Sequence, residues 1–259
     1  MEALSSHITF LMIGSGNMAF SLGKALVRHG HKPSGVFSRN ATTGTELAKI
    51  LETTFYPDLH QVKEPDMVFL CVSDTQIASV SELLKDWKDC IICHCSGAMP
   101  LSVLVKSVSQ CGVFYPLQTV QKNVPMNWNS VPILIEGKAK EIEIKLLTLA
   151  NTLSGNVAVC DSKMRAQYHL AAVVVNNFTT HLIALAQDYC SNHQLDFKIL
   201  LPLLNETMLR LQTGNAKDRQ TGPAVRNDNV TIERHLQLLK EQPALEKLYR
   251  LFTDSIQQK

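Results

Sequence analysis

Residues 8–19 read ITFLMIGSGNMA, an apolar run followed at once by Gly14, Gly16 and Ala19 in the spacing GxGxxA. The run predicts a buried strand, and the residues that follow predict a helix. At such a junction Gly14 permits a tight turn, Gly16 lets a pyrophosphate approach the backbone, and Ala19 keeps the helix near the strand. The stretch therefore predicts a dinucleotide-binding loop, and the alternative is a glycine turn without a ligand. The loop residues expected to bind the cofactor are Gly14, Ser15, Gly16, Asn17 and Met18.

Short β-rich runs alternate with helical segments through the first 160 residues. Several of the runs are continuously apolar, as expected of parallel strands that are covered on both faces. After Asp161 the pattern contains helices and no further strand. The predicted fold class is α/β, a Rossmann-type doubly wound and mainly parallel sheet followed by an all-α C-terminal domain. We expect a dinucleotide-binding domain at residues 1–161 and a helical domain for substrate binding and dimerisation at 162–259. The strand-like runs are 8–13, 35–38, 53–56, 67–72, 90–94, 113–115, 132–135 and 157–160.

The end of the second strand predicts which dinucleotide binds. NAD sites usually carry Asp or Glu here, to hold the ribose 2′-hydroxyl. This chain has Ser38, Arg39 and Asn40 instead. A guanidinium suits a 2′-phosphate, and the two neighbours can donate hydrogen bonds to it. The substitution favours NADP, and the alternative is an NAD site with Arg39 in a solvated loop.

Further strand ends are expected to line the same cleft, because ligands of doubly wound sheets sit outside the carboxyl ends of the strands. Ser73 follows the fourth run, and Ser96 and Gly97 follow the fifth. These three residues complete the predicted cofactor site. Because Ser96 and Gly97 are small, they would allow the nicotinamide end of the cofactor to approach closely.

The composition is that of an ordinary globular protein, with 259 residues, 45% hydrophobic residues and a net charge of +2. It excludes a disordered chain and a disulfide scaffold, and it favours neither nucleic acid nor a membrane as partner. Seven cysteines and no signal-peptide pattern predict a cytoplasmic protein. We expect no metal site, since alternate residues of a strand at Cys93, His94 and Cys95 would point to opposite faces.

The long predicted helix after Asp161 carries His169, Asn176 and Thr180 at spacings of seven and four. At helical periodicity they form one polar stripe on an apolar helix, and buried polar groups need partners or a wet cleft. One interpretation is substrate binding and proton delivery by His169 with help from Asn176. The other is a set of structural polar contacts. Arg226, in the stretch 221–228, could clamp a substrate carboxylate or brace its own loop.

Motifs along the whole chain carry a family resemblance. GSGNMA, VFSRN, CVSD, HCSG and YPLQT resemble the Rossmann-like half of NADP oxidoreductases related to coenzyme F420-dependent NADP reductases and pyrroline-5-carboxylate reductases. YHLAAVVVNNFTTHLIALA, PLLNET and TGPAVRNDNVTIERHL resemble the partner domain called DUF2520. The resemblance implies a homodimer through the helical domain and an active site between the domains. The lysine–asparagine pair of β-hydroxyacid dehydrogenases is not reproduced, because Ala172 stands four residues before Asn176.

These observations predict an NADP-dependent oxidoreductase that reduces a small carbonyl or imine substrate by hydride transfer from NADPH. The expected catalytic residues are His169, Asn176 and Arg226, the last of which would hold an acidic substituent. The alternative is a dimer that binds NADP(H) as a sensor or scaffold without turnover.

Overall fold

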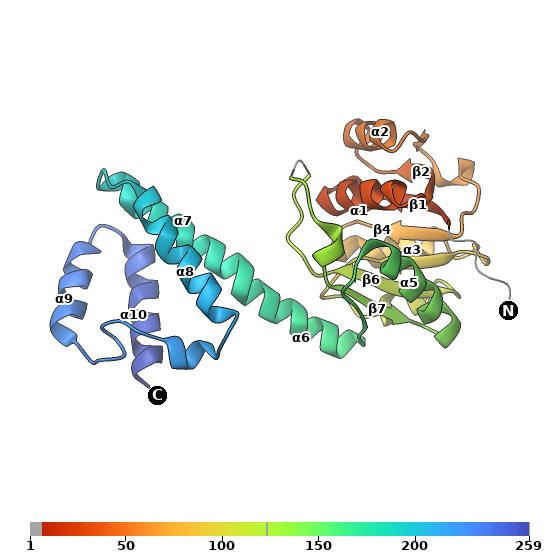
Figure 1. Ribbon diagram of the computed structural model, residues 1–259. Coiled ribbons are helices and arrows are strands. Elements are labelled where there is room, and N and C mark those ends of the chain that lie inside the picture. Colours follow the sequence, from red (N-terminus) through yellow and green to blue (C-terminus); the bar gives the residue numbers. More distant parts are fainter. Residues whose placement is uncertain (1–6, 123, 259) are drawn as a thin grey trace. The chain divides into compact units, whose positions relative to one another are not determined.

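The computed structural model describes residues 7–122 and 124–258. The chain divides into two compact units, Met1–Val173 and Val174–Lys259. The first unit is built around a β-sheet and the second from helices (Figure 1).

Within the described residues, the first unit contains one eight-stranded sheet with the order β3-β2-β1-β4-β5-β6-β7-β8. Neighbouring strands are parallel except for β6 and β7, which run antiparallel. The first six strands follow the order of the Rossmann fold, in which a dinucleotide binds where the order reverses. The predicted mainly parallel sheet is confirmed. The strands are β1 (Thr9–Ile13), β2 (Lys32–Phe37), β3 (Phe55–Tyr56), β4 (Met67–Leu70), β5 (Ile91–His94), β6 (Cys111–Pro116), β7 (Ile133–Gly137) and β8 (Val157–Val159).

Helices cover both faces of the sheet, because the inner strands are apolar on both sides. In β1, Phe10 and Met12 pack into one apolar cluster while Leu11 and Ile13 pack into the other. The first cluster includes residues of α1 (Asn17–Arg28), α2 (Ala41–Ile50) and α5 (Lys140–Leu153). The second includes residues of η1 (Leu59–Gln61), α3 (Ile77–Glu82) and α4 (Ser102–Val105). Two further short turns are η2 (Asp74–Gln76) and η3 (Trp128–Ser130).

A continuous helical segment leads from the first unit into the second. It consists of α6 (Ser162–Ala172), a π-helical stretch η4 (Val173–Phe178) and α7 (Thr179–Asn192). Asp161 caps its start, since the carboxylate accepts a hydrogen bond from the Met164 amide at 2.7 Å. The π-helical stretch changes the hydrogen-bond spacing from four to five residues. The prediction of uninterrupted α-helical spacing across this segment is wrong, whereas the polar stripe of His169, Asn176 and Thr180 stays a prediction.

The second unit is helical in its described residues, as predicted. Asp228 caps α9 (Asn229–Leu238) by accepting from the Thr231 amide at 3.1 Å. His235 Nδ1 and the Tyr249 hydroxyl, 2.8 Å apart, join α9 to α10 (Pro243–Gln257). By length and composition, the helical segment Ser162–Asn192 could cross a membrane. A single helix of this kind is weak evidence for a membrane span. The remaining elements of the second unit are η5 (Phe197–Leu200), α8 (Leu201–Leu211) and η6 (Ala216–Arg219).

Candidate functional site

The predicted phosphate loop lies where the strand order reverses, between β1 and β4. Gly14 has φ +108°, and a Cβ atom there would lie 2.2 Å from the carbonyl oxygen of Cys71. Its amide donates to the Phe37 carbonyl oxygen at 2.8 Å, so the turn also rests on β2. A side chain at this position would meet backbone atoms, which explains why the position is glycine.

A hollow of about 280 Å³, here called the carboxyl-edge hollow, opens at the ends of β1, β4 and β5. Gly16 begins α1 as its N-cap without a side-chain cap, and an added Cβ would meet nothing within 4 Å. The amides of the first turn are thus available to an anion, and the backbone can be approached closely. These features fit the pyrophosphate of a dinucleotide. The hollow is lined by Gly16, Asn17, Met18, Leu70, Cys71, Val72, Ser73, Asp74, Cys95 and Ser96, five of which were predicted to bind the cofactor.

Three hydroxyl groups meet at the end of β2. The Ser15 hydroxyl lies 2.8 Å from that of Ser38 and 2.6 Å from that of Thr43. Arg39 is exposed beside them, and the Asn40 side-chain oxygen caps α2 by accepting from the Thr43 amide at 3.1 Å. The structure therefore brings the predicted residues together and adds Thr43. Thr43 stands three residues after the capping Asn40, and this spacing in the sequence indicates a place in the first turn of α2.

Tyr115 and His169 form a pair at the carboxyl end of β6. The Tyr115 hydroxyl lies 2.9 Å from Nδ1 of His169, and the rings meet edge to face. A Cβ atom on Gly97 would lie 2.6 Å from each of the two rings, so glycine is required for this packing. Sequence reasoning predicted His169 and Gly97 but missed Tyr115. Tyr115 could have been found because it ends the predicted strand 113–115, whose carboxyl end lies at the same edge of the sheet as the cofactor residues.

Burial raises the pKa of the Tyr115 hydroxyl above its ordinary value, and the nearby Arg165 guanidinium opposes part of that rise. The hydroxyl consequently remains protonated throughout the neutral pH range and can act as a hydrogen-bond donor.

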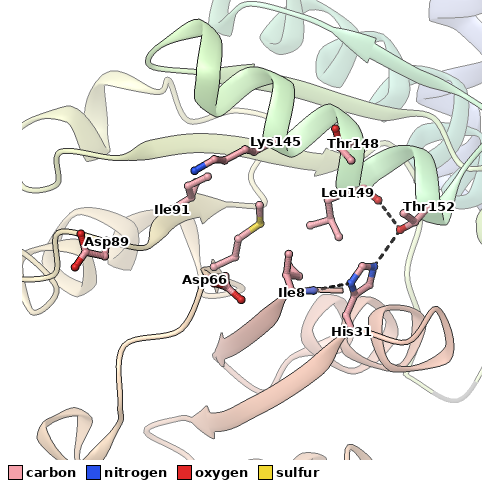
Figure 2. A pocket seen from close by; sticks show the side chains of 10 residues that line it. Ile8, His31, Asp66, Asp89, Ile91, Lys145, Thr148, Leu149 and Thr152 are labelled. Atoms are coloured by element: carbon pink, nitrogen blue, oxygen red, sulfur yellow. Dashed lines mark hydrogen bonds between the residues drawn. The ribbon is translucent and has the colours of Figure 1, made fainter. Parts of the chain in front are cut away.

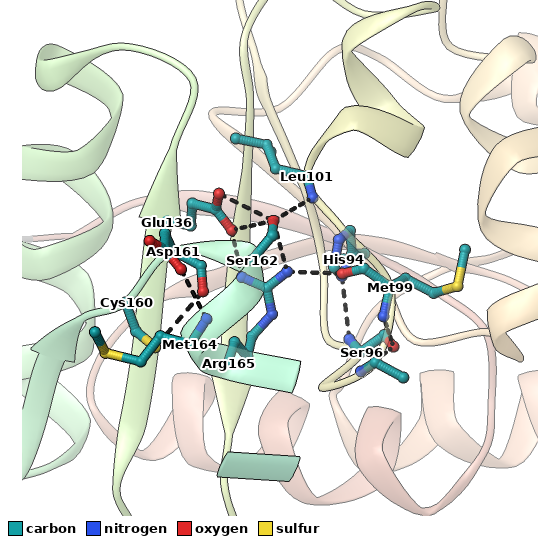
Figure 3. Close-up of polar contacts among 11 residues, drawn as sticks. His94, Ser96, Met99, Leu101, Glu136, Cys160, Asp161, Ser162, Met164 and Arg165 are labelled. Carbon is teal, nitrogen blue, oxygen red and sulfur yellow. Dashed lines mark hydrogen bonds and ion pairs between the residues drawn. The ribbon is translucent and has the colours of Figure 1, made fainter. Parts of the chain in front are cut away.

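A buried ion pair fixes the start of α6 to the sheet (Figure 3). The side chain of Arg165, 1% exposed, pairs with Glu136 of β7 and donates to the Met99 carbonyl oxygen at 2.7 Å. The Ser162 hydroxyl donates to Glu136 at 2.7 Å and accepts from the Leu101 amide at 2.9 Å. His169 stands four residues after Arg165, on the same face of α6, so the anchor also directs the imidazole toward Tyr115.

His94 ends β5 beneath the same site and is completely buried. Its Nδ1 accepts from the Ser96 amide at 3.2 Å, while Nε2 has no hydrogen-bond partner among the described residues. The Pro100 carbonyl lies close enough to favour the protonated ring, although it does not reach hydrogen-bond geometry. Burial, followed by repulsion from Arg165, outweighs it and lowers the pKa of His94 to about 4. The neutral ring thereby holds the Ser96 turn in place.

Ser96 and Ser73 hold the turns that line the hollow. The Ser96 hydroxyl oxygen accepts from the amides of Ala98 and Met99 at 3.1 and 3.0 Å. Ser73 is the residue before η2, and its hydroxyl lies 3.3 Å from that of Thr75.

Two predicted catalytic residues belong to the second unit. Asn176 lies in the π-helical stretch, and its carbonyl oxygen accepts from the Thr180 hydroxyl at 2.8 Å. Arg226 is exposed in the turn before α9. Asp228 caps that helix, and the ion pairs of the described chain do not join it to Arg226. The roles of Asn176 and Arg226 remain predictions from the sequence.

Another cavity, of about 310 Å³, lies at the opposite edge of the sheet (Figure 2). It is lined by Ile8 and Met67 from the beginnings of strands and by Thr152 of α5. His31 spans it, accepting from the Ile8 amide at 3.3 Å and lying 3.1 Å from the Thr152 hydroxyl. Because it is remote from the glycine turn, we assign the dinucleotide to the carboxyl-edge hollow. In the described part of the chain, no group of three or more His, Cys, Asp or Glu residues could hold a metal ion.

Comparisons with known proteins agree with this geometry. One family model, "NADP oxidoreductase coenzyme F420-dependent", matches residues 8–96, and another, "Domain of unknown function (DUF2520)", matches residues 131–256. The fold and the site define a Rossmann-type protein that binds a nicotinamide dinucleotide. A Bacteroides fragilis structure, described as a "putative NADP oxidoreductase", is 34% identical with a TM-score of 0.92, covering 98% of this chain and 99% of that chain. The chain belongs to this family of NADP oxidoreductase-like proteins with a DUF2520 domain.

More distant structures share the fold. A reductive aminase from Aspergillus terreus, solved with NADPH and ethyl levulinate, is 14% identical with a TM-score of 0.72 and coverage of 97% of this chain and 93% of that chain. A 1-pyrroline-5-carboxylate reductase from Streptococcus pyogenes is 17% identical with a TM-score of 0.61, covering 98% and 100% respectively. A search of curated protein sequences finds no significant match.

We expect an added methyl group to have different effects at the two glycines of the loop, on stability at Gly14 and on dinucleotide binding at Gly16. Gly14→Ala will destabilise the protein by about 1–3 kcal/mol, because φ is positive and the Cys71 carbonyl blocks the Cβ. Gly16→Ala will leave the unfolding free energy nearly unchanged but weaken dinucleotide binding, since its Cβ points into open space needed by the ligand. Urea unfolding and fluorescence titration with NADPH measure both. Equal stability of the two variants would contradict the assignment.

Proposed function

We propose that the protein is an NADPH-dependent reductase of a small carbonyl or imine compound. The observation that carries the proposal is the Tyr115–His169 pair, which lies beside Gly97 at the sheet edge where the dinucleotide hollow opens. A bound nicotinamide cofactor would supply the hydride. The protein must then supply a proton donor, and a tyrosine hydroxyl paired with an imidazole is suited to that task.

The proton donor would work as a relay of two groups. With its Nδ1 protonated, His169 donates to the Tyr115 oxygen, which leaves the phenolic hydrogen free for the substrate. As negative charge develops on the substrate oxygen or nitrogen, Tyr115 gives its proton to that atom and His169 passes its Nδ1 proton to the phenolate oxygen. Nε2 of His169 takes up a proton from water, so the imidazole ends neutral. The raised pKa of Tyr115 keeps the donor protonated before the reaction.

Two structural neighbours support reduction of such substrates. The reductive aminase was solved with NADPH and a keto ester, and the other enzyme is named for reducing a cyclic imine. Both share the fold with this chain at low identity, so they support the reaction class and not a particular substrate.

The relay predicts a large loss of turnover when either member is removed. Tyr115→Phe and His169→Gln will lower kcat by about 10²–10⁴-fold while leaving NADPH affinity nearly unchanged, since neither side chain lines the hollow. NADPH oxidation against a panel of small aldehydes, ketones and cyclic imines measures this. Tyr168→Phe is the matched control, because Tyr168 is an exposed tyrosine next to His169 on α6. Full activity of both relay variants would exclude the relay, and no turnover by wild type on the panel would favour a non-catalytic dinucleotide-binding protein.

The hydroxyl cluster supports a preference for NADP over NAD. Ser15, Ser38 and Thr43 concentrate hydrogen-bond donors beside Arg39 at the position of a ribose 2′-phosphate. Arg39→Ala will weaken NADPH binding by about 10–100-fold, the loss of a charge-assisted hydrogen bond, and leave NADH binding unchanged. Thr43→Val will act in the same direction with a smaller effect. Parallel titrations with NADPH and NADH measure the ratio, and equal wild-type affinities would contradict the assignment.

We also propose that the protein is a homodimer through its second unit. None of the residues of α8 is buried, and Leu203 of α8 is 66% exposed. Ile199 and Val175 are 75% and 72% exposed. Apolar side chains on so much of one unit are typical of a surface that a partner covers. A second copy is the occupant that the resemblance predicts.

Light scattering will give twice the chain mass of 28.8 kDa for the wild type. Ile199→Glu or Leu203→Glu will shift the protein toward the monomer, because a charge would be buried in the interface. Ile50→Glu, at an apolar position on α2 of the first unit that is 44% exposed, is the control. A monomeric wild type would contradict the proposal.

A cytoplasmic location is part of the proposal. All seven cysteines are free thiols, as expected in a reducing compartment.

A further inference from the structure

Two cysteines face each other in the carboxyl-edge hollow. Cys71 follows β4 and Cys95 follows β5, and the register pairs the preceding residues, Leu70 with His94. Their sulfur atoms lie 3.7 Å apart. Neighbouring strands are about 4.8 Å apart, which falls within the range of about 4.4–6.8 Å that Cα atoms of a disulfide span. This spacing and the 3.7 Å separation of the sulfurs are compatible with a disulfide, which rotation of the side chains would complete.

The residues that carry these two thiols are also the least buried cysteines. Both are half-buried and line the hollow, whereas the other five cysteines are buried. A small solute that enters the hollow meets this pair, although both side chains also pack against the apolar core. Access and proximity together distinguish Cys71 and Cys95 from the other thiols.

We propose that Cys71 and Cys95 form a site of reversible oxidative modification, at which a small hydroperoxide closes a disulfide in the wall of the dinucleotide site. The Cys71 thiol donates a hydrogen bond to the sulfur of Cys95. That hydrogen bond and burial raise the pKa of the Cys71 thiol. Because Cys71 is the donor in this hydrogen bond, we assign Cys95 as the attacking sulfur.

The reaction balances in two steps. The Cys95 sulfur attacks the hydroperoxide, the O–O bond breaks, and the Cys95 proton leaves with the alcohol that forms, giving a sulfenic acid. The Cys71 sulfur then displaces the hydroxyl group, whose oxygen takes the Cys71 proton and departs as water. Two thiols are oxidised by two electrons in total, and the hydroperoxide is reduced to an alcohol and water. Thiol–disulfide exchange with a sufficiently reducing thiol reverses the change.

The disulfide would alter the dinucleotide site because both cysteines support it. The carbonyl oxygen of Cys71 is the atom against which Gly14 packs, and Cys95 directly precedes Ser96. Forming a bond of about 2.05 Å from a separation of 3.7 Å moves the sulfurs together by about 1.7 Å in the wall of the hollow. Dinucleotide binding and disulfide formation should therefore oppose each other. The disulfide does not depend on the proposed reductase activity, whereas this opposition rests on the dinucleotide site.

The test treats the purified full-length protein with tert-butyl hydroperoxide at low molar excess and maps cross-linked peptides by mass spectrometry. We expect a peptide joining Cys71 to Cys95, lighter by two hydrogen atoms and lost on treatment with dithiothreitol. Cys71→Ser and Cys95→Ser will each abolish it. Cys93→Ala, which removes the preceding thiol on the same face of β5, will not. Circular dichroism confirms that the variants are folded.

A second arm measures the link to the cofactor. NADP⁺ at saturation should slow formation of the cross-link several-fold, and the oxidised protein should bind NADP⁺ several-fold more weakly than the reduced protein. Absence of the Cys71–Cys95 peptide, or a mixture of other pairs, overturns the site. A cross-link that neither responds to NADP⁺ nor changes its affinity overturns the opposition. Failure of the reductase proposal appears separately, as a reduced protein that binds NADPH but turns over no substrate.

Discussion

The close contact between the Gly14 turn and the Cys71 carbonyl is the constraint on which the dinucleotide site depends. Only a residue without Cβ can turn at the end of β1 while the end of β4 passes directly beneath it. Cys71 also donates its amide to the Ile13 carbonyl oxygen at 2.8 Å, so the two strand ends are joined on both sides of the turn. This contact sets the direction of α1, the position of the hydroxyl cluster and the width of the hollow.

The parallel direction of the strands explains why the candidate site residues gather at one edge of the sheet. Parallel strands bring all their carboxyl ends together, and each end here is followed by small or polar residues. Gly14, Ser38, Ser73, Ser96 and Gly97 have different local roles, in a turn, a hydroxyl cluster or a cap. They share an edge because β1, β2, β4 and β5 are parallel neighbours. The amino edge of the sheet also has a cavity, but its described lining includes neither a glycine nor the first turn of a helix.

The order of elements and the phosphate loop could be predicted from the sequence, because they depend on local patterns. The apolar runs gave the strands, and the glycine spacing gave the turn. Tyr115, Thr43 and the Cys71–Cys95 pair were missed because each acquires its meaning from a neighbour on another element. Hydroxyl and thiol groups have no period in the sequence that reveals such a neighbour. The π-helical stretch was missed for a related reason, since no residue pattern marks a change of hydrogen-bond spacing.

The buried pair of Arg165 and Glu136 is best explained by position. Replacing a buried ion pair with apolar residues is often neutral for stability, whereas removing one partner costs about 3–5 kcal/mol. Stability alone therefore does not account for the pair. The guanidinium instead connects three segments, since it contacts Glu136 of β7, the Met99 carbonyl and Ser162 of α6. An apolar contact has no preferred direction, but these hydrogen bonds fix the rotation of α6 about its axis. That rotation decides whether His169, one turn further on, points at Tyr115 or away from it, and we infer that this is why the charges are buried there.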